Sequence, residues 1–92
     1  MSTAPLAGQV LVITGGAGGL GAAAAGVAAG RGARVVLLDR DADALARAAS
    51  TIPADVDTYV LDVTDPAACT RVVGEIVAAH GRIDVVWANA GV

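Results

Sequence analysis

A glycine cluster near the start of the chain has the composition of a phosphate-binding loop. The segment reads Thr14-Gly-Gly-Ala-Gly-Gly-Leu-Gly21 and directly follows a short apolar run, Gln9–Thr14. Glycine lets the chain turn sharply and lets the backbone approach a pyrophosphate, because no Cβ atom stands in the way. A helix that starts at such a loop offers free N–H groups and its positive dipole end to the phosphates. The segment therefore predicts a dinucleotide-binding loop.

An acidic residue after the next apolar run indicates how a nucleotide sugar would be held. Asp39 ends the run Arg34–Asp39. A carboxylate at that point can accept hydrogen bonds from both hydroxyls of an adenosine ribose, and it repels a 2′-phosphate. Arg40 could hold that phosphate, but Gly18 in the loop supplies no cation. We therefore expect NAD as the cofactor in preference to NADP. Asp41 is the better candidate for capping a helix, so Asp39 is not needed there.

Two other nucleotide-binding classes use a glycine-rich turn. A P-loop requires a lysine before Ser or Thr, and this chain contains no lysine, which excludes a P-loop NTPase. A methyltransferase that binds an adenosyl group also has a glycine-rich first turn and an acid after its second strand. The residues considered so far leave that alternative open.

The composition indicates a small α/β domain. The chain has 92 residues, of which 55% are hydrophobic, and its only aromatic residues are Tyr59 and Trp87. A core of Ala, Val, Leu and Ile suits helices packed on a parallel sheet, whose buried strands are continuous apolar runs. Asp41 and Asp65 are predicted helix caps, and we expect Gly26 and Gly30 to let the first helix approach the sheet closely. The predicted strands are Gln9–Thr14, Arg34–Asp39, Thr58–Asp62 and Ile83–Trp87, and the predicted helices are Leu20–Arg31, Ala42–Ser50 and Pro66–His80.

The charge pattern excludes several kinds of partner. The net charge is −3, and the six arginines are scattered rather than gathered in a stripe, so we expect neither a nucleic acid nor an anionic membrane as a partner. No apolar run is long enough to span a membrane. The lone Cys69 has no metal-ligand spacing around it, and no metal site is predicted. The first residues do not form a signal peptide, which favours a cytoplasmic location.

Three motifs in order make the chain resemble the short-chain dehydrogenase/reductase family. They are Thr14-Gly15-x-x-x-Gly19-x-Gly21, then Leu61-Asp62-Val63, and finally Ala88-Asn89-Ala90-Gly91, where Ala88 replaces the family's first Asn. Taken singly, Asp62 could merely end a strand, and the Asn89 segment could be any turn. The resemblance covers Gly8 to Val92 and implies a Rossmann-like, three-layer α/β fold with a parallel sheet in the order 3-2-1-4.

The resemblance also implies roles for individual residues. Asp62 would bind the adenine amino group, Val63 would follow the adenine ring, and Asn89 would lie near a cofactor ribose and support the central strand. The candidate cofactor-binding residues are Gly15, Gly18, Gly19, Leu20, Gly21, Asp39, Arg40, Asp62, Val63, Asn89, Ala90 and Gly91.

The residues that perform the family's chemistry have no counterpart in this sequence. The family transfers hydride with a Ser, a Tyr and a Lys four residues after that Tyr, but Tyr59 is followed at that distance by Val63. His80 ends a helix, where it is expected to interact with the helix dipole. We therefore expect no catalytic residue here, and we interpret residues 1–92 as a dinucleotide-binding half-domain that lacks the catalytic portion.

Two hypotheses follow from this interpretation. In the first, the chain is the NAD-binding segment of an oxidoreductase whose complete form transfers hydride between NAD and an alcohol or carbonyl substrate. In the second, it is a stand-alone module that binds adenosine or NAD without catalysis. The fourth strand would be an open sheet edge in either case, so we expect a homo-oligomer or an edge-paired dimer.

Overall fold

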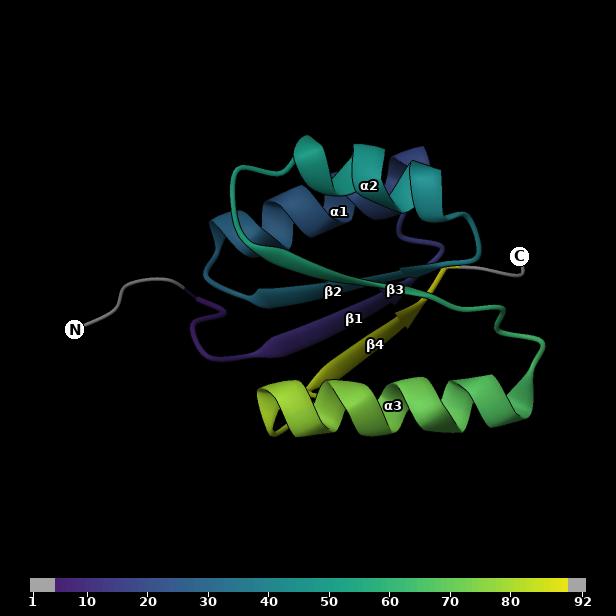
Figure 1. The fold of residues 1–92 in the computed structure, drawn as a ribbon. Helices are drawn as coiled ribbons and strands as arrows, with labels where there is room; N and C mark the ends of the chain where they lie inside the picture. The colour runs from purple at the N-terminus through teal and green to yellow at the C-terminus, as the bar shows by residue number, and fades with distance from the viewer. Residues whose placement is uncertain (1–4, 90–92) are drawn as a thin grey trace.

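The structure is a computed structural model that describes residues 5–89. It contains one parallel sheet of four strands in the order β3-β2-β1-β4. Helices α1 and α2 cover one face of this sheet and α3 covers the other, which gives three layers (Figure 1). The elements are β1 (Val10–Thr14), α1 (Gly19–Gly30), β2 (Arg34–Asp39), α2 (Ala42–Ser50), β3 (Val56–Val60), α3 (Pro66–His80) and β4 (Val85–Ala88). The predicted α/β class and strand order are confirmed.

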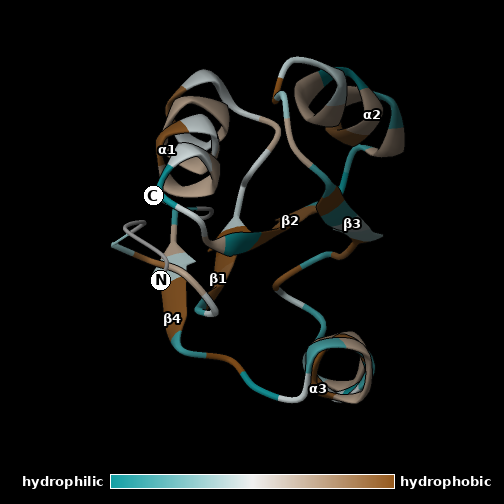
Figure 2. Cartoon of the chain, turned by 90° about the vertical axis from the view of Figure 1, so that its left-hand side faces the viewer, coloured by the Kyte–Doolittle hydropathy of each residue, from teal (hydrophilic) through white to brown (hydrophobic). Residues whose placement is uncertain are grey.

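The central strands β1 and β2 are buried on both faces. Ile13 and Leu37 belong to the core cluster beneath α1 and α2, whereas Val12 and Val36 belong to the cluster beneath α3. Neighbouring residues of a strand point to opposite faces, so a strand covered on both sides must be apolar throughout. Figure 2 shows these two strands as hydrophobic ribbons between the helical layers.

The first helix approaches the sheet at a different glycine from those predicted. A Cβ atom added at Gly26 or Gly30 would meet nothing within 4 Å, so neither glycine permits a close contact, and that expectation was wrong. A Cβ atom added at Gly21 would lie 2.7 Å from the carbonyl oxygen of Gly15. Gly21, Ala25 and Ala28 are the buried residues of α1, and their spacing places them on one helical face. That face excludes Gly26 and Gly30.

Three strands have different bounds from those predicted, and β1, expected from Gln9, begins at Val10. β3 was expected to span 58–62, but it pairs with β2 from Val56 to Val60, because the chain turns after Leu61. The amide of Asp65 donates to the carbonyl of Asp62 at 3.0 Å and closes this turn. β4 was expected from residue 83 and begins at Val85.

Aspartate side chains cap α2 and α3 at their N-termini, as predicted. The Asp41 carboxylate accepts a hydrogen bond from Ala44 N at 3.0 Å, and the Asp65 carboxylate accepts one from Ala68 N at 3.2 Å. His80 lies in the last turn of α3, and its Nε2 atom is 2.5 Å from Asp57 Oδ2 on β3. This contact with β3 was not predicted, and it fastens the end of α3 to the sheet.

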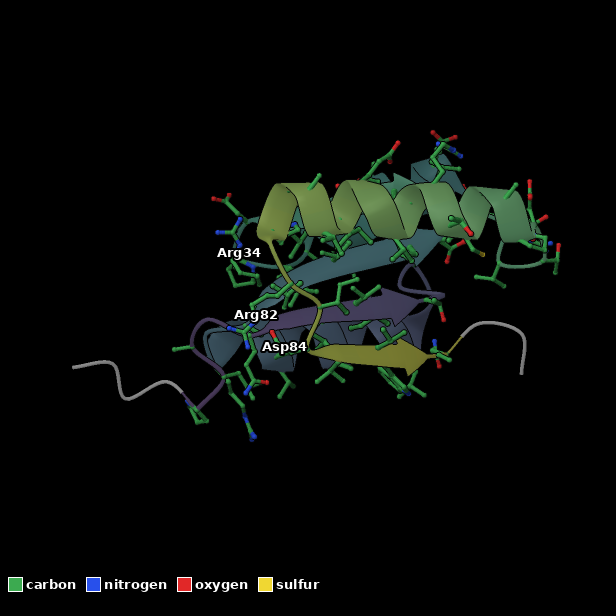
Figure 3. The ribbon with its side chains drawn as sticks, turned by 90° about the horizontal axis from the view of Figure 1, so that it is seen from below. Arg34, Arg82 and Asp84 are labelled. Carbon is green, nitrogen blue, oxygen red and sulfur yellow. The ribbon has the colours of Figure 1, made fainter. Side chains whose placement is uncertain are left out.

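An aspartate joins β1 and β4 at the end of the sheet where the strands begin. Asp84 Oδ2 accepts a hydrogen bond from Val10 N at 2.7 Å, and Asp84 Oδ1 accepts one from Arg82 Nε at 2.9 Å. Figure 3 shows Arg82 and Asp84 side by side at this end. The pKa of Asp84 is lowered mainly by its hydrogen bond with Arg82, and the Val10 amide lowers it further.

We predict that Asp84 makes folding depend on acidity. Because its pKa is lower in the folded chain, its stabilisation is fully present above the ordinary carboxyl pKa of about 3.9 and is lost as the pH falls through the folded pKa. Asp84→Asn should therefore lower the thermal unfolding midpoint at pH 7, and the gap should close as the pH falls below about 4. Asp55→Asn is the control, because Asp55 is exposed and makes no hydrogen bond among residues 5–89. A gap for Asp84→Asn that stays constant from neutral to acidic pH would contradict this account.

Candidate functional site

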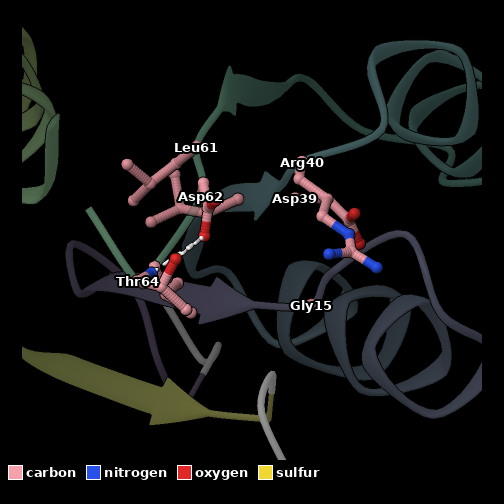
Figure 4. A pocket seen from close by; sticks show the side chains of 8 residues that line it. Gly15, Asp39, Arg40, Leu61, Asp62 and Thr64 are labelled. Atoms are coloured by element: carbon pink, nitrogen blue, oxygen red, sulfur yellow. Dashed lines mark hydrogen bonds between the residues drawn. The ribbon is translucent and has the colours of Figure 1, made fainter.

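The carboxyl ends of β1, β2 and β3 surround a pocket of about 290 Å³. One side is formed by the glycine loop after β1, and the other sides are formed by the residues that follow β2 and β3 (Figure 4). Ligands of open α/β sheets bind outside the carboxyl ends of the strands, where the strand order reverses. In this sheet that point lies between β1 and β4, next to the pocket. The lining residues are Gly15, Leu38, Asp39, Arg40, Leu61, Asp62, Val63 and Thr64.

The glycine loop is held in a tight turn against β2. Gly15 has a φ of +67°, a conformation that favours glycine. The amide of Gly16 donates to the carbonyl of Leu38 at 3.0 Å, and the amide of Gly18 donates to the carbonyl of Gly15 at 3.1 Å. These bonds place the start of α1 beside the pocket.

The N-terminus of α1 is arranged to accept an anion. Its N-cap residue is Gly18, which makes no side-chain cap hydrogen bond, and the first turn contains no acidic residue. The first amides of a helix have no partner within the helix. No side chain in the described range 5–89 caps them as Asp41 caps α2. Gly19, Leu20 and Gly21 form this first turn, and Leu20 is exposed. The uncapped turn therefore suits a phosphate.

Asp39 connects two segments that border the pocket. Its Oδ2 atom accepts a hydrogen bond from Ala17 N in the glycine loop at 3.2 Å, and its Oδ1 atom accepts one from Asp41 N at 3.1 Å. The carboxylate thus holds the loop at the end of β2, while Asp41 caps α2, as the sequence predicts. The contact with Ala17 could not be predicted, because the donor is a backbone amide of the loop.

Asp62 lies across the pocket from the glycine loop, at the end of β3. Its Oδ1 atom accepts hydrogen bonds from Thr64 N at 2.9 Å and from Thr64 Oγ1 at 2.6 Å. These bonds lower the pKa of Asp62, with the hydroxyl as the largest cause, and the charge of Arg40 lowers it further. The contact with Thr64 was not predicted from the sequence. A local signal existed, because an aspartate side chain often accepts a hydrogen bond from the backbone amide two residues later and so forms an Asx turn.

Asn89 connects the ends of β4 and β1. Its backbone amide donates to Thr14 Oγ1 at 3.0 Å, and its Nδ2 atom donates to the carbonyl of Gly15 at 3.3 Å. The Thr14 hydroxyl also donates to the carbonyl of Trp87 at 3.4 Å. Asn89 therefore supports the central strand and the base of the glycine loop. Ala90 and Gly91, which were also predicted to bind the cofactor, lie outside the described residues.

The structure gathers most of the predicted residues at this one end of the sheet. Five of them line the pocket, four form the loop and first turn of α1, and Asn89 contacts the loop from β4. The pocket residues are Gly15, Asp39, Arg40, Asp62 and Val63.

The one tyrosine of the sequence lies away from this pocket. Tyr59 packs against the core cluster beneath α3 instead of lining the pocket. Burial is the largest cause that raises its pKa, and Asp57 and Glu75 add to it. Among residues 5–89 no group of His, Cys, Asp and Glu side chains could hold a metal ion. Within the same range, no helix is sufficiently long and apolar to cross a membrane.

The fold and the site define a Rossmann-like nucleotide-binding class. Residues 9–92 match the family model described as short chain dehydrogenase, and the chain belongs to the short-chain dehydrogenase/reductase family. This membership removes the methyltransferase alternative.

Known relatives agree with this assignment. The chain is 42% identical over 90 residues to the 3-oxoacyl-acyl-carrier-protein reductase FabG of Thermotoga maritima, an alignment that covers 95% of this chain and 37% of the reductase. It superposes on an NAD+-bound xylitol dehydrogenase with a TM-score of 0.85 and 32% identity, covering 89% of this chain and 33% of that one. A metagenomic short-chain oxidoreductase in complex with NADP gives a TM-score of 0.83 and 37% identity, covering 88% and 38% of the two chains. The chain thus spans about a third of the length of these relatives, whose cofactors include both NAD and NADP.

Proposed function

We propose that this chain is the NAD-binding segment of an oxidoreductase that transfers hydride between NAD and an alcohol or carbonyl substrate. The observation that carries the proposal is the pocket that brings Asp39 and Asp62 together beside the glycine loop. Its two acids stand at the ends of neighbouring strands, and Arg40 also lines the pocket. Such a set of groups suits an adenosine whose ribose carries free hydroxyls.

Each part of the site matches one part of the dinucleotide. The uncapped first turn of α1 would bind the pyrophosphate, because its free amides and dipole favour an anion. Asp39 would accept hydrogen bonds from the ribose hydroxyls, and Asp62 would accept one from the adenine amino group. Val63 would lie along the ring, and Asn89, with Ala90 and Gly91, would lie near the second ribose. When bound, NAD supplies the carbon that accepts or donates hydride.

The preference for NAD over NADP follows from charge. A 2′-phosphate would be placed beside the Asp39 carboxylate, which already accepts hydrogen bonds from two backbone amides. Arg40 could compensate in part, but its positive charge also acts on Asp62 across the pocket. The loop itself contributes no cation. Repulsion by Asp39 therefore dominates.

Proton transfer to or from the substrate requires groups outside these 92 residues. The sequence has no lysine, and its only tyrosine is half-buried against the core cluster beneath α3. We therefore propose that residues 1–92 form the cofactor half of a larger enzyme. The second candidate is a stand-alone adenosine-binding module, which is favoured by the fact that all groups proposed for the adenosine lie on this chain.

Titration calorimetry of the chain with NAD, NADP and AMP tests the proposal. We expect NAD to bind at least about tenfold more tightly than NADP, a difference of about 1.4 kcal/mol. Similar affinities for NAD and AMP would favour the adenosine module. The absence of NAD binding by a folded chain would refute both candidates, and tighter binding of NADP would refute the assignment of Asp39.

A further inference from the structure

Thr64 fixes the carboxylate of Asp62 through two donors. Its amide and its hydroxyl both donate to Oδ1, at 2.9 Å and 2.6 Å, and Figure 4 shows the two side chains facing each other at the pocket wall. The second oxygen, Oδ2, accepts no hydrogen bond from any residue in the range 5–89. One oxygen of the carboxylate is therefore occupied, and the other is available to a ligand.

The position of Thr64 is itself set by hydrogen bonds of the turn that precedes α3. The Asp65 amide donates to the carbonyl of Asp62 at 3.0 Å, which closes the turn that contains Thr64. The Asp65 side chain caps α3, whose residues Val72 and Ile76 are buried against the sheet. The hydroxyl of Thr64 is thus attached, through this turn, to the packing of α3.

We propose that Thr64 is a positioning residue for adenine recognition: by holding Oδ1 of Asp62, it presents Oδ2 as the acceptor for the purine amino group. This inference rests on the proposed function, because it assumes that the pocket binds adenine.

The hydroxyl is needed because an exposed carboxylate is otherwise free to rotate. The last torsion of an aspartate side chain has a broad minimum, and Asp62 is exposed. The backbone amide of Thr64 alone leaves the plane of the carboxylate able to turn about this torsion. A second donor on the same oxygen restricts that rotation, and it also favours the charged form of Asp62, as its lowered pKa indicates. A ligand that donates a hydrogen bond to Oδ2 then binds to an acceptor whose orientation is fixed.

The test compares NAD with nicotinamide hypoxanthine dinucleotide, in which a carbonyl oxygen replaces the adenine amino group. We expect Thr64→Val to weaken NAD binding about three- to tenfold, the effect of losing roughly one hydrogen bond. Binding of the hypoxanthine analogue should change less than about twofold, because it has no amino group for Asp62 to accept from. Thr64→Ser should restore NAD binding. Thr70→Val is the matched control, because among residues 5–89 the Thr70 hydroxyl bonds only to the carbonyl of Pro66 within α3.

Each outcome decides a different point. Unchanged NAD binding by Thr64→Val, or an equal loss for both dinucleotides, would overturn the positioning role. If the wild-type chain binds neither dinucleotide, the proposed function fails, and the positioning is then judged from the Asp62 pKa measured by carbon-13 NMR. We expect that pKa to lie below its ordinary value in the wild type and to rise in Thr64→Val. An ordinary value in the wild type would overturn the positioning on its own.

Discussion

Replacing Gly21 with alanine should destabilise the chain and abolish detectable NAD binding. The added Cβ atom would lie 2.7 Å from Gly15 O, 3.1 Å from Gly16 Cα and 3.3 Å from Asn89 Nδ2. Two of these three atoms are backbone, so the helix and the glycine loop would have to move apart. Overpacking of this kind costs about 1–3 kcal/mol, and the displaced loop would no longer present the first turn of α1 to a phosphate.

Gly26→Ala provides the matched control within the same helix. A Cβ atom at Gly26 meets nothing within 4 Å. Alanine is the better helix former by about 1 kcal/mol, so this variant should be more stable than the wild type. Urea unfolding should show that Gly21→Ala is less stable than the wild type and that Gly26→Ala is more stable. NAD titration should show the loss of binding for Gly21→Ala alone. A Gly21→Ala chain as stable as Gly26→Ala would show that the close approach at Gly21 is not required.

Replacing Asp39 with alanine should weaken NAD binding by about tenfold or more, because each hydrogen bond to a charged group contributes about 1.5–3 kcal/mol. Two effects contribute. The variant loses the acceptor for the ribose hydroxyls, and it also releases Ala17 N from the carboxylate. NADP binding should fall much less, because the repulsion of the 2′-phosphate disappears while Arg40 is retained. The measured ratio of NAD to NADP affinity should therefore fall.

Asp43→Ala is the control, because it also removes a negative charge near the start of α2, close in sequence to Asp39. Asp43 is exposed in the first turn of α2 and does not line the pocket. Calorimetry should give the same ratio of NAD to NADP affinity for this variant as for the wild type. An equal loss of both affinities in Asp39→Ala would mean that Asp39 only supports the loop and does not select the cofactor.

The sequence predicts the layers of this fold because the signals are periodic and local. Continuous apolar runs such as Val35–Leu38 predict strands buried on both faces, and both core clusters draw on that run. Asp41 and Asp65 directly precede the helices that they cap. The strand order came from the family resemblance rather than from these patterns, and the structure confirms it.

Contacts between distant segments could not be predicted in the same way. The composition shows several glycines in α1, but only the packed structure shows that Gly21 faces the loop and Gly26 does not. The contact between His80 and Asp57 depends on where α3 ends relative to β3. Ala17 acts through a backbone amide whose direction depends on the turn of the glycine loop, so its residue type alone does not reveal the contact with Asp39.

The hydrogen bond between Asp39 and Ala17 has a consequence for how affinity can evolve. This bond attaches the loop to the end of β2 as part of the fold, so the conformational entropy of the loop is lost during folding rather than during binding. A ligand that approaches Asp39 meets a carboxylate with spare acceptor sites, since an ionised carboxyl has about four lone-pair sites. Thermodynamic stability and cofactor selectivity are therefore coupled at a single side chain. A substitution of Asp39 that favours another nucleotide must therefore also supply a new acceptor for Ala17 N, because that hydrogen bond holds the loop.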